Sequence, residues 1–376
     1  MTIDDLAAKL AWTREGKAPI LPALGQALLG RPFPASATRR VLLAYQPARI
    51  AQTQFYPFLH HAQRFAAHGI HFRAIPFSKL TAAILPKQLD ALFLQSSYTP
   101  APGELEGLLG GIRAARPDLK IAYFDWFAPT DIRFAERVDP WVDYYVKKAL
   151  LRDRAQHIVP TVGHTILDDH YADRFGLPNP PIAWDLPPSI LGKLVLGPSF
   201  STGPSLIGLF EGRDAPPDGP RPIDLHARIA VRGSPWYSAM RRESRDAVTS
   251  LFPDLRVASE GLVPKAEFMR EMEQSKLCFS PFGYGEICWR DFEAIATGAV
   301  VIKQDMSHLE SDPDIYLPFE TYIPVKWDLS DLDERVRAAL ADPAGTRRIA
   351  ERAFTVVRDH LRGPALETFA QRLTAR

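Results

Sequence analysis

Short apolar runs alternate with helical stretches along most of the chain, and this alternation restricts the fold more than any other feature. The apolar runs have the length of buried strands, and the segments between them have helical spacing. A strand, a helix and a further strand in this order require a crossover connection, which makes the strands parallel. The alternation stops over residues 155–220, where prolines crowd, and resumes at Ile223. The sequence therefore predicts two parallel α/β domains joined by a long connection that is irregular but ordered.

The same alternation predicts where the elements lie. In the first half we expect strands over residues 41–45, 70–77, 90–94, 120–127 and 142–146, with helices over 54–68 and 104–115. In the second half we expect strands over 223–231, 255–258, 276–282, 299–303 and 322–325, with helices over 236–251, 264–274, 287–297, 332–340 and 347–360. A last helix over 365–373 is expected to pack back on the first domain.

These elements set the predicted domain boundaries. Residues 1–190 form the first domain, and they begin with a helical or irregular lead-in over 1–38. Residues 191–345 form the second domain, and residues 346–376 add the C-terminal helices.

Charge and composition exclude several classes of protein. The 45 Lys and Arg residues are balanced by 44 Asp and Glu, so no overall positive field attracts nucleic acid, and we expect no nucleic-acid partner. The beginning of the sequence lacks a signal-peptide pattern, and no apolar run approaches the roughly 20 residues that span a bilayer. Only peripheral membrane association stays open. Cys278 and Cys288 cannot form a disulfide framework, so we expect a reducing compartment, the cytoplasm.

Residues 276–310 carry the most informative chemistry. They are predicted to form a strand, a glycine turn, a helix, a glycine stop and another strand. Gly283, Tyr284 and Gly285 make the turn, which would lie outside the carboxyl end of a parallel strand, where open α/β sheets bind ligands. The backbone amides that begin the following helix favour an anion at this place.

The helix over 287–297 separates an apolar arc from a narrow polar stripe when it is projected at 100° per residue. Glu286, Arg290, Glu293 and Thr297 make up the stripe. Arg290 suits a diphosphate, which a guanidinium binds bidentately, and Glu293 can accept two hydrogen bonds from a ribose diol. The alternative is a solvated Glu–Arg–Glu ladder without a ligand, and spacing alone does not decide between the two.

Several positions between residues 280 and 303 resemble the donor-site signature of GT-B glycosyltransferases. They are the stretch Ser-Pro-Phe-Gly-Tyr-Gly-Glu over 280–286, Arg290, the Glu-Ala pair at Glu293, Gly298 and the apolar strand that ends at Lys303. Bacterial family-1-like and exostosin-like enzymes are the most similar. The resemblance implies two Rossmann-like domains that face each other across a cleft, with a nucleotide-sugar donor held by the second. It also implies that Arg290 meets the diphosphate, Glu293 the ribose, and Glu286 the sugar or its phosphate.

The loop after the strand over 299–303 reaches the same edge of the sheet. Lys303, Asp305 and His308 are therefore candidates for lining the donor pocket. The alternative is a polar surface loop in which His308 is a cap or lies exposed.

The resemblance also brings the first turn of the second domain to the cleft. Candidate contacts to phosphate or base are then Arg228, Arg232, Tyr237 and Arg241. Arg232 is preferred because it directly precedes Gly233. The alternative is a surface arginine cluster paired with nearby acids.

The first domain is expected to hold the acceptor and, for an inverting reaction, the general base. Asp125 ends a predicted strand among aromatic residues, where a carboxylate could deprotonate a sugar hydroxyl and the rings could stack on sugar. The alternative is an Asp that caps the next turn. Asp131 lies too far along the chain to make a convincing metal pair with it. His60, His61 and His68 are interpreted as solvated helix residues, no Cys/His set has zinc spacing, and no metal is predicted.

The sequence thus indicates a metal-independent glycosyltransferase, of hexosyl or related type, that needs no cofactor beyond its nucleotide-sugar substrate. The acceptor is expected to be a saccharide, a glycolipid or a protein, as in polysaccharide biosynthesis. Two alternatives stay open: a GT-B-like sugar-nucleotide epimerase or hydrolase, and a non-catalytic nucleotide- or carbohydrate-binding subunit. The short basic run over 147–154 is interpreted as a solvated helix face, and the alternative is a contact for an anionic acceptor or a membrane-associated glycolipid.

Overall fold

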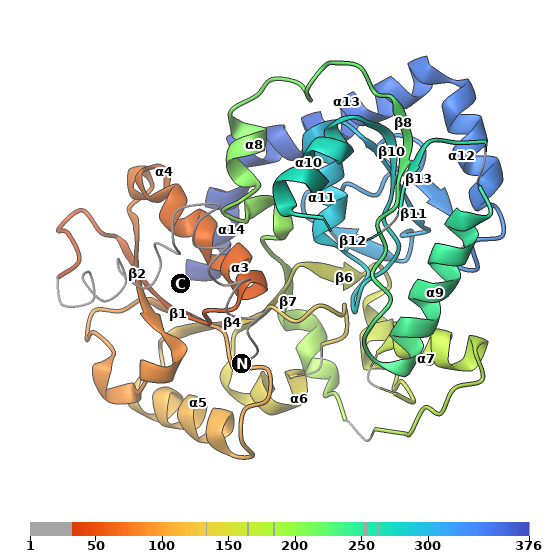
Figure 1. Cartoon of the computed structure of the whole chain (residues 1–376). Helices are drawn as coiled ribbons and strands as arrows, with labels where there is room; N and C mark the ends of the chain where they lie inside the picture. The colour runs from red at the N-terminus through yellow and green to blue at the C-terminus, as the bar shows by residue number, and fades with distance from the viewer. Residues whose placement is uncertain are drawn as a thin grey trace.

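Two α/β domains lie side by side in the computed structural model of the chain (Figure 1). The structure describes residues 32–132, 134–163, 165–182, 185–251, 254–259, 261 and 263–375. Most of the predicted lead-in over 1–38 lies outside these residues. Each domain is built around one parallel sheet, so the predicted fold class is confirmed.

The first domain contains a six-stranded sheet in the order β2-β1-β3-β4-β5-β7, and every pairing in it is parallel. Its strands are nearly continuous apolar runs because helices and loops cover both faces of the sheet. The strands are β1 (Arg39–Tyr45), β2 (Ile70–Pro76), β3 (Ala91–Leu94), β4 (Lys120–Asp125), β5 (Tyr144–Lys147) and β7 (Leu194–Leu196), and the helices are α3 (Arg49–His60), α4 (Ala62–Ala67), α5 (Glu104–Ala115) and α6 (Ala135–Val138).

The second domain contains a five-stranded parallel sheet in the order β13-β11-β10-β8-β9. The order reverses between β8 and β10, and in open α/β sheets the crevice at such a point, outside the carboxyl ends of the strands, is where ligands bind. The strands are β8 (Ile223–His226), β9 (Val257–Ala258), β10 (Ser275–Phe279), β11 (Val300–Gln304) and β13 (Ile323–Val325), and the helices are α9 (Pro235–Thr249), α10 (Lys265–Glu273), α11 (Trp289–Thr297), α12 (Leu332–Ala341) and α13 (Pro343–Arg362).

Two features of the link between the domains differ from the prediction. Strand β6 (Ala149–Leu151) pairs antiparallel with β12 (Leu309–Ser311), so a small ribbon ties the two halves of the chain together. The connection over 155–220, predicted to be irregular, contains α7 (Ile166–Arg174), β7 and α8 (Ile207–Glu211). Because β7 belongs to the first sheet, this sheet extends beyond the predicted boundary at residue 190.

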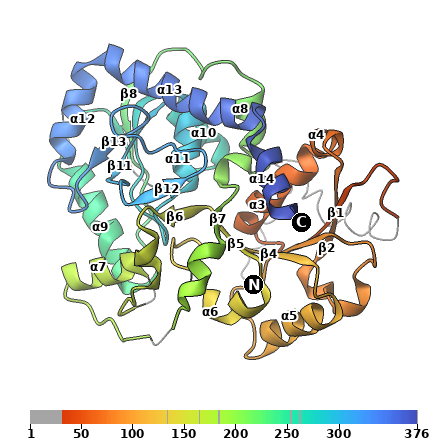
Figure 2. The same ribbon diagram turned by 180° about the vertical axis from the view of Figure 1, so that it is seen from behind.

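The last helix, α14 (Ala365–Thr374), lies against the first domain, as the view from behind shows (Figure 2). Leu366, Ala370 and Leu373 join the core cluster that contains the first-domain strand β1. Short 3₁₀ helices complete the fold: η1 (Phe77–Lys79), η2 (Ala82–Ile84), η3 (Asp139–Trp141), η4 (Arg154–Ile158), η5 (Pro188–Lys193) and η6 (Phe200–Thr202). Within the described ranges, no helix has both the length and the apolar character needed to cross a membrane.

Candidate active site

A pocket of about 700 Å³ lies at the carboxyl edge of the second sheet. The loop that follows β8 forms one wall, because β8 ends at His226 and not at the predicted residue 231. Helices α9 and α11 contribute further side chains. Five arginines line the pocket: Arg228, Arg232, Arg241, Arg245 and Arg290.

Arg241 and Arg290 lie side by side in this pocket without counter-charges. Arg241 is 6% exposed, and its guanidinium donates to the carbonyls of Ala230 (3.3 Å) and Phe282 (3.1 Å). Arg290 donates to the carbonyl of Arg228 at 2.6 Å, and its Nε has no partner. Burial, and then the charge of Arg290, lower the pKa of Arg241. Among the described residues neither guanidinium has a carboxylate partner, so an anion in the pocket would offset their mutual repulsion.

The other arginines of the pocket differ in the groups that they contact. Arg228 forms two 2.6 Å contacts with the carboxylate of Glu271 on α10. Arg232 is exposed at the pocket lining. The structure thus brings all four predicted arginines to one pocket, and it leaves Arg241 and Arg290 as the pair that lacks acids.

Two glycine turns are held together beside this pocket. Tyr237 and Tyr284 stack with ring centroids 4.2 Å apart, and the Tyr284 hydroxyl accepts a hydrogen bond from the Ser234 amide at 2.9 Å. Gly233 has a φ of +131°, and a β-carbon there would lie 2.4 Å from the Tyr284 hydroxyl oxygen. A larger residue would therefore separate the turns. Gly283 donates its amide to the Gly285 carbonyl at 3.0 Å, which closes the second turn.

Helix α11 begins at Trp289, two residues later than predicted, because Asp291 caps it. The Asp291 carboxylate accepts from the Cys288 amide at 2.9 Å and from the Tyr316 hydroxyl at 2.6 Å. The sequence interpretation missed Asp291, although an acid at the third helical position is the usual signal of a capping box.

Lys303 is fully buried beneath the turn. Its ammonium lies 3.3 Å from the Asp291 carboxylate and donates to the Ser280 carbonyl at 3.0 Å. The prediction that Lys303 lines the donor pocket is therefore wrong, and the residue supports the turn from below.

Glu286 lies before the helix and is fully buried between the domains, so its predicted place on the helical stripe is wrong. Its Oε2 accepts from the amide (3.2 Å) and hydroxyl (2.7 Å) of Thr130 in the first domain. Its Oε1 has no partner. A β-carbon on the neighbouring Gly285 would lie 1.9 Å from the Ala128 carbonyl oxygen, so this glycine lets the two domains touch.

His308 lies near this carboxylate. Burial lowers the pKa of His308, and the charges of Glu286 and Asp305 partly offset that effect. Its Nε2 has no hydrogen-bond partner, and its ring lies 5.2 Å from the Trp327 ring. His308 is half-buried and thus belongs to the domain junction, not to an exposed loop.

Glu293 faces α10. The residue is 5% exposed, and its carboxylate forms an ion pair with Lys265. The side chain of Lys265 is 31% exposed, which leaves room for it to move when a ligand approaches. The solvated ladder with Arg290 is excluded, because Arg290 and Glu293 each have a different partner.

Asp125 is fully buried, and both oxygens of its carboxylate have partners. Its carboxylate accepts from the Tyr145 hydroxyl (2.6 Å) and the Phe127 amide (2.9 Å), and it pairs with Lys147 at 2.9 Å. These contacts argue against Asp125 as a general base, because removal of its charge would leave Lys147 buried without a partner.

The basic run over 147–154 is not a solvated helix face. Lys147 and Lys148 are buried at the end of β5, and burial, then the charge of Lys147, lower the pKa of Lys148 to about 7. Arg154 pairs with Glu310 at 2.6 Å across the β6–β12 ribbon. The run therefore helps to join the domains.

A second pocket, of about 560 Å³, lies between the domains. Most of its lining is aromatic or proline. The first domain and its connection contribute Ile50, Tyr98, Trp126, Phe127, Pro178 and Pro180, and the second domain contributes Pro235, Trp236 and Tyr284. The predicted aromatic surroundings of Asp125 are found here, whereas the contribution of Trp236 was not foreseen.

The described residues contain one cluster of His, Cys, Asp or Glu side chains with metal-ligand spacing, and it lies outside both pockets. It consists of His60, His61 and Glu211. His61 is buried, so the interpretation of these histidines as solvated is wrong for this residue.

Comparison with known proteins agrees with this geometry. Residues 221–371 match the model of a family described as glycosyl transferase-like. The match covers the whole arginine-lined pocket and less than half of the chain. No curated protein sequence matches the chain.

Two solved structures share the fold. An alpha-glucosyltransferase in complex with UDP and a 13-mer DNA is 10% identical, with a TM-score of 0.51, over 90% of this chain and 100% of that chain. An alpha-glucosyltransferase in complex with UDP is 10% identical, with a TM-score of 0.50, over 90% and 99% of the two chains. At these identities the likeness concerns the fold alone. Together with the family match, it confirms the predicted resemblance to GT-B glycosyltransferases.

Proposed function

We propose that this glycosyltransferase takes its sugar from a nucleoside-diphosphate donor and transfers it to a saccharide acceptor. The single observation that carries the proposal is the pair Arg241 and Arg290, which share the pocket at the carboxyl edge of the second sheet without counter-charges. A diphosphate supplies the missing negative charge. It also becomes the leaving group, so the same two guanidiniums stabilise the charge that develops as the glycosidic bond breaks.

We assign the remaining donor contacts from the surroundings of this pair. Arg232 at the pocket lining adds a third cation toward the phosphates. Glu293, on the α10 side of α11, accepts from the ribose hydroxyls, and its partner Lys265 moves aside or bridges to the nucleotide. The stacked Tyr237 and Tyr284 hold the two turns at the spacing that the donor requires.

We propose that the transfer needs no divalent metal at this site. Two or three guanidiniums already neutralise a diphosphate, and the described residues place no cluster of acidic or imidazole ligands at the pocket. The sugar moved is a hexose or a related sugar, in line with the expectation from the sequence.

The acceptor is assigned to the aromatic pocket between the domains. Trp126 of the first domain and Trp236 of the second present ring faces on which the C–H surfaces of a sugar stack. Glu286 takes the role of the carboxylate at the reacting sugar, because Thr130 fixes one of its oxygens and the other has no partner. Residues from both domains are needed, so closure over the substrates would exclude water that otherwise hydrolyses the donor.

A transfer assay with UDP-, GDP- and CMP-sugars against a panel of saccharide acceptors tests this function. We expect the enzyme to release the nucleotide from one of the nucleoside-diphosphate sugars, at a rate that rises strongly when the acceptor is added. The rate is expected to be the same when a chelator removes divalent metal ions. Equal nucleotide release without any acceptor would favour the hydrolase or epimerase alternative. Nucleotide binding without release under all conditions would favour a non-catalytic binding subunit.

A further inference from the structure

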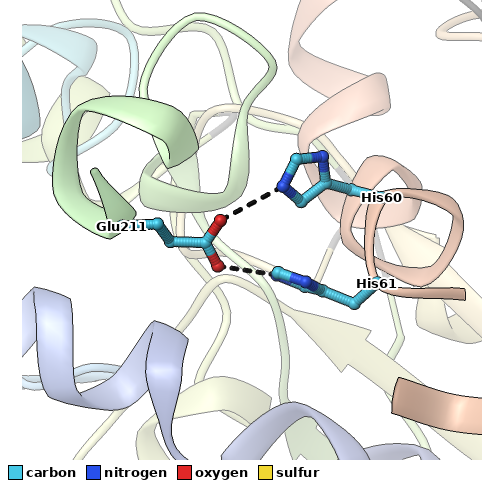
Figure 3. Close-up of side chains that lie close together, drawn as sticks. All are labelled: His60, His61 and Glu211. Carbon is cyan, nitrogen blue, oxygen red and sulfur yellow. Dashed lines mark hydrogen bonds and ion pairs between the residues drawn. The ribbon is translucent and has the colours of Figure 1, made fainter. Parts of the chain in front are cut away.

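Two adjacent histidines and one glutamate converge at a place that sugar transfer does not use. His60 is the last residue of α3 in the first domain, His61 follows it, and Glu211 is the last residue of α8 in the connection between the domains. Both imidazole rings point at the same carboxylate (Figure 3). His60 Nε2 lies 3.1 Å from one carboxylate oxygen, and His61 Nε2 lies 3.0 Å from the other.

The contact of His61 is not an ordinary hydrogen bond. His61 is 9% exposed, and its Nε2 is shielded from solvent yet has no hydrogen-bond partner of acceptable geometry, in spite of the nearby oxygen. The buried nitrogen thus has a close contact with the Glu211 carboxylate but no well-aligned hydrogen bond, so a group placed between the two could bind it better. The three ligand atoms all lie within 4.8 Å of one another, which leaves a shared point between them.

We propose that His60, His61 and Glu211 bind one Zn²⁺ ion, with water as the fourth ligand. Two imidazole nitrogens and one carboxylate oxygen are a common zinc set, with metal–ligand distances of about 2.0–2.2 Å. Ligands at tetrahedral angles around such an ion lie about 3.3 Å apart. The three ligand atoms here lie within 4.8 Å of one another, so the side chains would have to draw together around the ion.

The charge state of the cluster suits a cation. Glu211 supplies one carboxylate, and His60 and His61 supply two imidazole nitrogens, which ligate a metal in their neutral form. The described residues place no second acid within the cluster that would compete for its role.

The site would join segments that are far apart in the sequence. Glu211 is also held from the C-terminal side, because Arg362 of α13 donates to its carbonyl at 2.7 Å. A bound ion would therefore link helix α3 of the first domain to the connection and, through it, to the second domain. None of its ligands lines the arginine pocket or the aromatic pocket, so we do not assign the ion a part in sugar transfer.

Metal titration of the full chain tests the proposal. The protein is first treated with a chelator, and the chelator is then removed. Zn²⁺ binding is measured by calorimetry, and Co²⁺ binding by visible absorption, because the Co²⁺ spectrum reports tetrahedral coordination. We expect one equivalent to bind and the thermal unfolding temperature to rise. Glu211→Gln and His61→Ala are expected to raise the zinc Kd by about 10-fold or more. His68→Ala removes an exposed histidine that directly follows helix α4 and is expected to leave binding unchanged.

Two results would overturn the proposal. One is the absence of stoichiometric Zn²⁺ binding and of a tetrahedral Co²⁺ spectrum in the unsubstituted chain. This result does not depend on whether any variant folds. The other is equal binding by Glu211→Gln and His68→Ala, which would place the ion elsewhere and leave these three side chains as an ion-paired cluster. Sugar transfer below the unfolding temperature is expected to be the same with and without zinc, so failure of this site would not touch the proposed function.

Discussion

Replacement of Arg290 by alanine separates a binding role from a structural one. In the structure Arg290 makes one hydrogen bond, to the Arg228 carbonyl, which contributes about 1 kcal/mol to stability. Its removal also relieves the repulsion with Arg241, so we expect the free energy of unfolding to change by less than about 1 kcal/mol. Hydrogen bonds between charged groups contribute about 1.5–3 kcal/mol each. Loss of a bidentate pair to a diphosphate would therefore weaken binding, and lower transfer, by about 100-fold or more.

The assay is calorimetric titration of Arg290→Ala with UDP and with inorganic pyrophosphate, alongside denaturant unfolding. Both Kd values are expected to rise together while the unfolding midpoint stays near that of the unsubstituted chain. Arg242→Ala is the matched control, because Arg242 is exposed on α9 and does not line the pocket. UDP affinity within about twofold of the original, or a large loss of stability, would refute the reasoning.

Three further predictions follow from neighbouring contacts. Glu293→Gln is expected to weaken UDP binding about 10-fold but to leave pyrophosphate affinity unchanged, since it removes a ribose contact; equal losses for both ligands would contradict this. Gly285→Ala is expected to cost about 1–3 kcal/mol of stability and to reduce transfer, because its β-carbon would meet the Ala128 carbonyl; unchanged unfolding would show that the domains can part freely. His157 accepts from the Leu151 amide at 2.9 Å, and burial, then nearby cations, lower its pKa to about 3. Below about pH 6.5 the unfolded chain therefore binds a proton at His157 that the folded chain does not bind. The free energy of unfolding is expected to fall between pH 7 and pH 5 by about 2 kcal/mol more than it does in His157→Gln. Parallel pH profiles of the two proteins would contradict this prediction.

The parallel sheets could be predicted from the sequence because each strand is a local apolar run. The glycine-bounded unit around Gly283 and Gly298 was also local, and so its turn, helix and following strand were found in the right order. Arg290 could be named from its position on the helical stripe, and Arg228, Arg232 and Arg241 from the resemblance to GT-B glycosyltransferases, which places the loop after β8 at the cleft.

The rest depended on contacts between residues far apart in the chain. Capping by Asp291 moved the start of α11 by two residues. Glu286, predicted to extend the polar stripe of this helix, instead contacts Thr130 of the first domain. The pairing of β6 with β12 crosses more than 150 residues, and no local pattern announces it. Whether an acid such as Asp125 is free or paired depends on its tertiary partners, here Lys147 from the next strand.

A crystal structure of the chain with a bound nucleoside diphosphate tests the central claim most directly. We expect the β-phosphate within hydrogen-bonding distance of both Arg241 and Arg290, and the ribose hydroxyls at Glu293. A diphosphate bound elsewhere, with both guanidiniums still contacting only backbone carbonyls, would contradict the account.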